Sequence, residues 1–121
     1  MPSNPREKGQ AAENLALEYL QGWGLKLISR NFSGRRGEID LIMLDGTFVV
    51  FVEVRARRSK VPVHPLESID TRKIRKIILT SQQFLQAERK YQASKCRFDV
   101  VCITGTVDEP NIEWIKGAFD A

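Results

Sequence analysis

The stretch that decides the fold is GEIDLIMLDGTFVVFVEVRARR, residues 37–58. It holds two apolar segments joined by an Asp-Gly pair, which is the two-residue signal of a tight β-hairpin. Acidic residues interrupt both segments: Glu38 and Asp40 on the first, and Glu53 on the second. A buried ionised carboxylate costs several kcal/mol unless it is paired or bound to a metal. The pattern therefore predicts a functional site on two adjacent core strands.

Helices and further strands flank this hairpin. Apolar residues recur at helical spacing between Asn4 and Gly24 and again over residues 70–91, which predicts two helices. The remaining apolar segments predict strands at 25–32, 38–44, 47–57 and 96–104, a short last strand at 111–115, and a turn in the tail 117–121. The second helix makes a crossover, so the strand after it can run parallel to an earlier one. We expect an α/β fold with an αβββαβ core, in which helices flank a mixed central sheet, as a single domain over residues 1–121.

Composition narrows the class of protein. The chain has 121 residues, a net charge of +4 and a pI near 9.3, so it is mildly basic. No segment is long and apolar enough to span a bilayer, and the N-terminus lacks the apolar core of a signal peptide. We therefore expect a cytoplasmic protein with no membrane partner. Cys96 and Cys102 share one predicted strand, roughly 20 Å apart, which is too far for a disulfide.

Basic residues crowd the middle of the chain around the acidic positions. An arginine-rich cluster of this kind favours contact with nucleic acid, although an ordinary solvated surface is the alternative. Cations in the first turns of the second helix oppose the helix dipole, yet they strengthen phosphate binding at a helix N-terminus. The predicted nucleic-acid contacts are Arg35, Arg36, Arg57, Arg58, Arg72, Lys73 and Lys76. His64, in the loop before that helix, is either a proton carrier or an ordinary loop residue.

The acidic residues have the chemistry of a metal site. Hard divalent cations prefer carboxylate and carbonyl oxygens, and magnesium keeps several waters, so few protein ligands suffice. Asp40 and Glu53 could supply two ligands and the carbonyl of Val54 a third, holding Mg²⁺ or Mn²⁺. Glu13, on the first helix, either points at the site or is a charge at the edge of the apolar stripe. Arg55 beside the metal would stabilise the negative charge of a phosphoryl transition state.

The acid on the second strand, Asp40, followed by Glu53-Val54-Arg55 on the third, resembles the pattern of the PD-(D/E)XK nuclease superfamily. The phrases GEIDLIM, FVEVRARR, CRFDVV and EWIK resemble the YraN-like family of uncharacterised bacterial proteins over nearly the whole chain. The resemblance implies a restriction-endonuclease-like fold related to archaeal Holliday junction resolvases, and a role on nucleic acid. Glu13 matches the helix glutamate of resolvase-like members, and resolvases act as dimers, so a homodimer is expected.

One position departs from the superfamily: Arg55 stands where lysine is usual. Arginine stays protonated, so it can bind a phosphate but cannot act as a base. Three hypotheses follow. The chain is a magnesium-dependent endonuclease, acting on branched or damaged DNA or on other nucleic acid; or it is a module that binds nucleic acid without cutting it; or Asp40, Glu53 and Arg55 form a structural ion-pair network in a protein-binding protein. The acids favour the first hypothesis and Arg55 the second, while Glu38 is a candidate, beside Glu13, to complete the coordination of the metal or to support its ligands.

Overall fold

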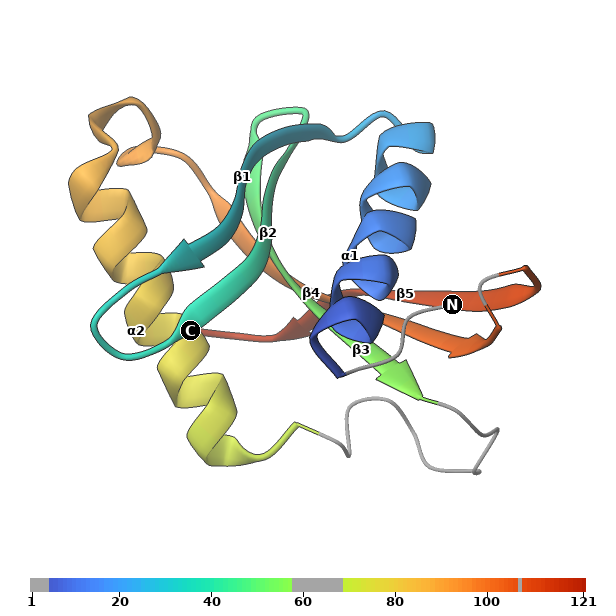
Figure 1. Cartoon of the computed structure of the whole chain (residues 1–121). Helices are drawn as coiled ribbons and strands as arrows, with labels where there is room; N and C mark the ends of the chain where they lie inside the picture. Colours follow the sequence, from blue (N-terminus) through green and yellow to red (C-terminus); the bar gives the residue numbers. More distant parts are fainter. Residues whose placement is uncertain (1–4, 58–68, 107) are drawn as a thin grey trace.

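The computed structural model describes residues 5–57, 69–106 and 108–121, with side chains described from residue 9 onward. Two residues singled out from the sequence, Arg58 and His64, lie outside this description. The elements are α1 (Pro5–Gly22), β1 (Lys26–Ser33), β2 (Glu38–Asp45), β3 (Phe48–Arg57), α2 (Thr71–Ala87), the 3₁₀ turn η2 (Arg89–Tyr91), β4 (Cys96–Gly105) and β5 (Pro110–Phe119). The predicted αβββαβ order is confirmed, with β5 added after it (Figure 1).

The five strands form one mixed sheet in the order β1-β2-β3-β4-β5. The first three strands pair antiparallel, β3 and β4 pair parallel, and β4 and β5 pair antiparallel. A parallel pair needs a long crossover between its strands, and α2 lies in that crossover. The topology puts β3, which carries Glu53, at the centre of the sheet.

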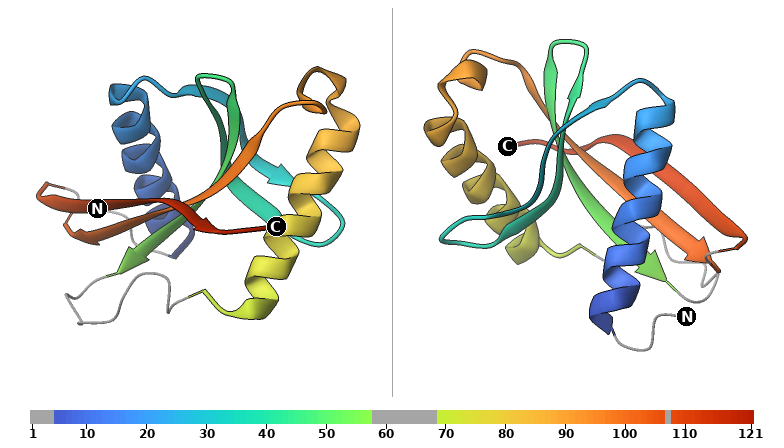
Figure 2. Two further views of the ribbon diagram at one scale, coloured as in Figure 1. Left: turned by 180° about the vertical axis from the view of Figure 1, so that it is seen from behind. Right: turned by 45° about the horizontal axis from the view of Figure 1, so that its top comes forward.

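The two helices cover opposite faces of the sheet, as the views in Figures 1 and 2 show. On one face, Leu20 of α1 belongs to the same buried cluster as Val50 and Val52 of β3. On the other face, Phe84 of α2 packs against Phe51, with ring centroids 6.1 Å apart. Each such side chain contributes roughly 1.5–3 kcal/mol when fully buried. Because both faces are covered, the central strands are apolar on both sides.

The structure corrects the sequence analysis at the ends of two elements. The second helix ends at Ala87 rather than at residue 91, because Glu88 leaves the helical conformation (φ −111°, ψ 89°). The last strand has ten residues, so the predicted turn in the tail is wrong. Gly117 adopts φ 59°, which glycine tolerates, and Phe119 then stacks on Phe98 with ring centroids 5.1 Å apart.

Two expectations on composition can be compared with the described residues. Cys96 and Cys102 are both free thiols on β4, as predicted. Neither helix in the described part of the chain is long and apolar enough to cross a membrane.

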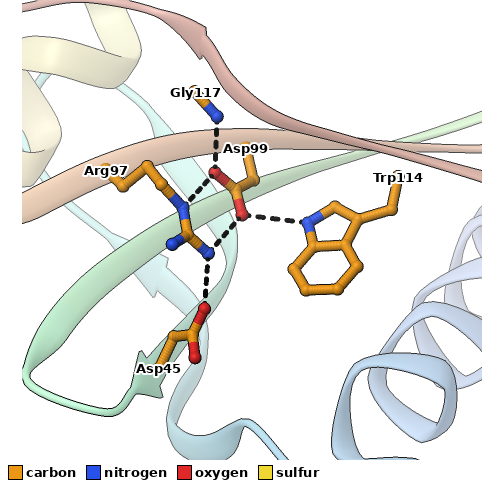
Figure 3. A network of polar contacts seen from close by, with 5 residues as sticks. All are labelled: Asp45, Arg97, Asp99, Trp114 and Gly117. Carbon is orange, nitrogen blue, oxygen red and sulfur yellow. Dashed lines mark hydrogen bonds and ion pairs between the residues drawn. The ribbon is translucent and has the colours of Figure 1, made fainter. Parts of the chain in front are cut away.

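A buried polar network fastens β5 and the β2–β3 hairpin to β4 (Figure 3). Asp99 of β4 is fully buried and accepts two hydrogen bonds from Arg97, at 2.9 and 3.0 Å. It also accepts one from Trp114 Nε1 at 2.9 Å and one from the Gly117 N–H at 3.0 Å. Arg97 reaches on to Asp45 at 2.9 Å. Asp99 is therefore a structural carboxylate whose main partner is a neighbouring arginine.

We expect Asp99→Asn to lower the free energy of unfolding by about 2–4 kcal/mol, because it removes a buried charge that satisfies several donors. Asp45→Asn is the matched control: it removes the other carboxylate on the same arginine, but the Asp45 side chain is 33% exposed, so the cost should stay near or below about 1 kcal/mol. Urea unfolding followed by tryptophan fluorescence measures both. Equal losses in the two variants would contradict the assigned role of Asp99.

Candidate active site

The site lies where β2 and β3 separate. The regular pairing of the two strands ends at Leu41 and Val52. Beyond that point the Asp40 side chain, rather than a backbone carbonyl of β2, accepts the next hydrogen bond from β3: its Oδ2 accepts the Val54 N–H at 2.8 Å. β3 continues alone with β4 as far as Arg57. The separation therefore leaves room for the Asp40 carboxylate between the strands, beside Glu53.

Glu53 is a buried carboxylate held by cations. The residue is 6% exposed. Its Oε2 lies 2.9 Å from Lys73 Nζ of α2 and 3.7 Å from Arg55 Nη2. Two cationic side chains, one from α2 and one from β3, thus pair with the same oxygen, and Lys73 is the nearer of the two. The expected pairing of Glu53 with Arg55 is present, but the closer partner comes from the helix.

Asp40 carries a proton near neutral pH. Burial, together with the hydrogen bond and the negative charge of Glu53, raises the pKa of Asp40 to about 8. The hydrogen bond from the Val54 N–H acts in the opposite direction. Two carboxylates this close cannot both ionise at little cost unless a cation lies between them. The pair is therefore arranged to release a proton when a cation binds.

Glu13 of α1 does not line the cavity of this site, but it senses the charges of Glu38 and Glu53. Burial raises the pKa of Glu13, with Arg30 opposing the rise and the charges of Glu38 and Glu53 adding to it. Arg30 Nη2 lies 3.8 Å from Glu13 Oε1 and donates to Asn14 Oδ1 at 2.8 Å. Glu13 is thus near enough to the other acids to feel their charge, which agrees with a side chain that points toward the site.

An open cavity of about 430 Å³ lies over the two carboxylates. Asp40 and Glu53 line it together with the first turns of α2, which contribute Asp70 and the cations Arg72, Lys73 and Lys76. Gly37 and Glu38 border it at the start of β2. An acidic floor and a basic rim in one cavity suit a phosphate bound through a cation.

Arg35 and Arg36 do not line this cavity. Their loop is held against α2 by Gln83, whose Oε1 accepts the Arg35 N–H at 2.8 Å. A Cβ on Gly34 would lie 2.6 Å from the same oxygen, so a larger residue here would have to displace the Gln83 side chain. Gln83 lies two turns of α2 beyond Lys76. The loop that carries the two arginines therefore lies beside α2, while Arg57 stands at the end of β3.

The residues present fit a hard divalent cation. Asp40 and Glu53 are adjacent carboxylates, and Val54 is placed beside them by its hydrogen bond to Asp40. Among the described side chains, Glu13 Oε1 and Glu53 Oε2 are buried and accept no hydrogen bond, although both lie in ion pairs. No group of three or more His, Cys, Asp or Glu in the described part of the chain could by itself enclose a metal ion. The set suits an ion that keeps several waters, such as Mg²⁺ or Mn²⁺.

Sequence reasoning assigned Lys73 to phosphate contact and missed its ion pair with Glu53. The usable signal was the cation in the first turn of α2, against the helix dipole. It also missed the role of Gln83, for which a polar residue on a helix gives no signal.

Comparison with known proteins finds close relatives over the full length of the chain. The model of the family described as "Uncharacterised protein family UPF0102" matches residues 12–103. A UPF0102 protein of Stutzerimonas stutzeri (strain A1501) is 48% identical over 119 residues, covering 98% of this chain and 99% of the relative. One of Pseudomonas fluorescens (strain Pf0-1) is 49% identical over 115 residues, covering 95% and 94%.

The raised pKa of Asp40 predicts an unusual dependence of stability on pH. Above about pH 4 the unfolded chain loses the proton that folded Asp40 keeps, so the free energy of unfolding falls as pH rises toward 8. Asparagine cannot ionise, so Asp40→Asn should escape this fall. The stability of the variant relative to the wild type should increase between pH 5 and 8, by up to about 1.4 kcal/mol per pH unit.

Urea unfolding at several pH values measures the difference, with Glu113→Gln as an exposed-carboxylate control. A difference between Asp40→Asn and wild type that does not change with pH would contradict the proposed environment of Asp40.

Proposed function

The chain belongs to the uncharacterised protein family UPF0102, as its resemblance to the YraN-like family predicts. From the geometry of its site, we propose that it is a metal-dependent, nuclease-like protein that hydrolyses phosphodiester bonds in nucleic acid. DNA, in branched or damaged form, is the expected substrate. A homodimer and a cytoplasmic location belong to the same proposal. Its place in the PD-(D/E)XK nuclease superfamily is likewise proposed, on the αβββαβ order and on Asp40, Glu53 and Arg55.

One observation carries the proposal: two adjacent carboxylates, buried Glu53 and half-buried Asp40, lie at the point where two core strands separate, under a cavity with basic side chains at its edge. Asp40 has a pKa raised to about 8 and Glu53 is held by two cations. Such strongly perturbed groups gather at functional sites, because a scaffold has no need to bring like charges together in its core. The cavity gives a substrate access to both carboxylates.

The residues divide the chemistry as follows. Asp40, Glu53 and the Val54 carbonyl would hold Mg²⁺ or Mn²⁺, and Glu13 would assist from α1. A divalent ion supplies polarisation of a phosphate oxygen and a lowered pKa for a water molecule. Arg55 stabilises the negative charge that develops on the phosphate. Arg72 and Lys76, at the rim, bind the neighbouring phosphates of the backbone, which fixes the position of the strand.

A structural ion-pair network is the plain alternative, and the contacts of Glu53 with Arg55 and Lys73 agree with it in part. In such a network, the opposite charges would neutralise one another and the side chains would fill the space between the strands and α2. Here the ion pairs leave a cavity of about 430 Å³, and Asp40 stays next to a second carboxylate. Asp99 shows how this fold accommodates a structural carboxylate: it is fully buried and accepts hydrogen bonds from Arg97, Trp114 and the Gly117 N–H.

The test is cleavage of linear, nicked and four-way-junction DNA by the purified protein with Mg²⁺ or Mn²⁺. We expect metal-dependent cutting of at least one substrate, reduced about 100-fold or more in Asp40→Asn and in Glu53→Gln, because each variant loses a ligand. Asp45→Asn, a carboxylate variant outside the cavity, serves as the matched control and should cut like the wild type.

Binding without cutting, with an affinity that falls steeply as salt rises, would support the alternative of a non-catalytic module with a nuclease fold. Neither binding nor cutting at low salt would exclude both nucleic-acid functions.

A further inference from the structure

We propose that Lys73 of α2 supplies the ammonium group that position 55 lacks, and that it contacts the reacting phosphate during hydrolysis. The inference rests on the proposed function and adds a catalytic residue to it. Lys73 was expected from the sequence to bind phosphates along the nucleic-acid backbone. Its place in the structure, against Glu53, assigns it to the reacting group itself.

The geometry brings Lys73 into the centre of the site. Its Nζ lies 2.9 Å from Glu53 Oε2, whereas Arg55 Nη2 lies 3.7 Å from the same atom. Lys73 also lines the cavity, and its side chain is 44% exposed. The ammonium group therefore touches a buried carboxylate on one side while the open cavity leaves it accessible to a substrate.

The start of α2 fixes the position of Lys73. Asp70 caps the helix, and its Oδ1 accepts the Lys73 N–H at 2.8 Å. The backbone from which the Lys73 side chain extends is therefore tied to the helix N-terminus, and Asp70 borders the same cavity. A flexible side chain on a fixed base can stay on Glu53 or turn toward a phosphate within the cavity.

The chemistry of the two cations differs. An ammonium is a compact point charge with three donors, so Lys73 can keep Glu53 and at the same time donate to a phosphate oxygen or to the attacking water. Arg55 has a planar group whose buried Nε makes no hydrogen bond among the described residues. Arg55 is thus placed to contribute charge, and Lys73 to contribute directed hydrogen bonds.

The helix dipole disfavours a cation at the position of Lys73, which indicates that this lysine has a role other than stabilising α2. A cation in the first turn opposes the helix dipole, and no acidic residue balances it within that turn. The ion pair with Glu53 gives one reason for its position. An ion pair alone, however, would not need an exposed ammonium at the edge of an open cavity.

The reaction balances without a proton from Lys73. The oxygen of water forms a bond to phosphorus, the bond from phosphorus to the leaving oxygen breaks, and the proton released by water passes through solvent to the leaving oxygen. Lys73 remains an ammonium throughout and stabilises the added negative charge by hydrogen bonding.

The experiment compares the wild type with Lys73→Met, Lys73→Met combined with Arg55→Lys, and Lys73→Arg, on the DNA that the wild type cuts best. Single-turnover cleavage is measured with Mg²⁺, and DNA affinity is measured without divalent ions. Lys95→Met, an exposed lysine before β4, controls for the loss of one positive charge. Thermal unfolding verifies that each variant is folded.

We expect Lys73→Met to cut about 100-fold or more slowly while its DNA affinity changes only a few-fold, because its contact is made mainly in the transition state. Adding Arg55→Lys to Lys73→Met should raise the cleavage rate at least about tenfold above that of Lys73→Met alone. Position 55 shares a face with Glu53, so a lysine there would return an ammonium group to Glu53. Lys95→Met should cut like the wild type. Lys73→Arg keeps a positive charge beside Glu53, so it tests the role of Lys73 even if Lys73→Met does not fold. We expect Lys73→Arg to cut at least about tenfold more slowly than the wild type.

The assignment of Lys73 is overturned, with the nuclease proposal intact, if the wild type cuts and the Lys73 variants cut at nearly the same rate, or if Arg55→Lys restores nothing to Lys73→Met. If the wild type cuts none of the DNA substrates, the nuclease proposal itself fails and the role of Lys73 fails with it.

Discussion

The constraint on which the site depends is the packing of two carboxyl groups, buried Glu53 and half-buried Asp40, side by side in the centre of a sheet. Each ionised carboxylate would cost several kcal/mol without partners. The fold offsets this by three means: a proton on Asp40, the Val54 N–H, and two cations on Glu53. A divalent ion would replace the proton, so the arrangement is stable without metal and prepared to receive it.

The surrounding fold makes this possible, because its helices cover both faces of the sheet and the described residues leave a cavity over the two carboxyl groups. The ladder between β2 and β3 stops at Leu41 and Val52, and the Asp40 side chain continues it. Asp99, a buried acid elsewhere in the same sheet, has a different environment, because it accepts hydrogen bonds from Arg97 of β4 and from Trp114 and Gly117 of β5 and so joins these two strands. Asp99 is bound by donors within the fold, whereas Asp40 and Glu53 lie against each other beside an open cavity, and this contrast separates scaffold from site.

Local sequence rules predicted most of the fold and half of the site. The Asp-Gly turn set the hairpin register, which brought Asp40 opposite Glu53, and helical spacing gave both helices. The tail was misjudged because Gly117 reads as a turn, whereas its N–H bonds Asp99 and keeps the strand going. The pairing of Lys73 with Glu53 could not be predicted either, because it depends on how α2 packs over the sheet, and tertiary packing leaves no periodic signal.

The most direct test is a crystal of this protein soaked in Mn²⁺ and measured at a wavelength where manganese scatters anomalously. We expect an anomalous peak between the carboxylates of Asp40 and Glu53, with the Lys73 ammonium beside it at the edge of the cavity. A map with no peak there at millimolar Mn²⁺ would contradict the proposed metal site.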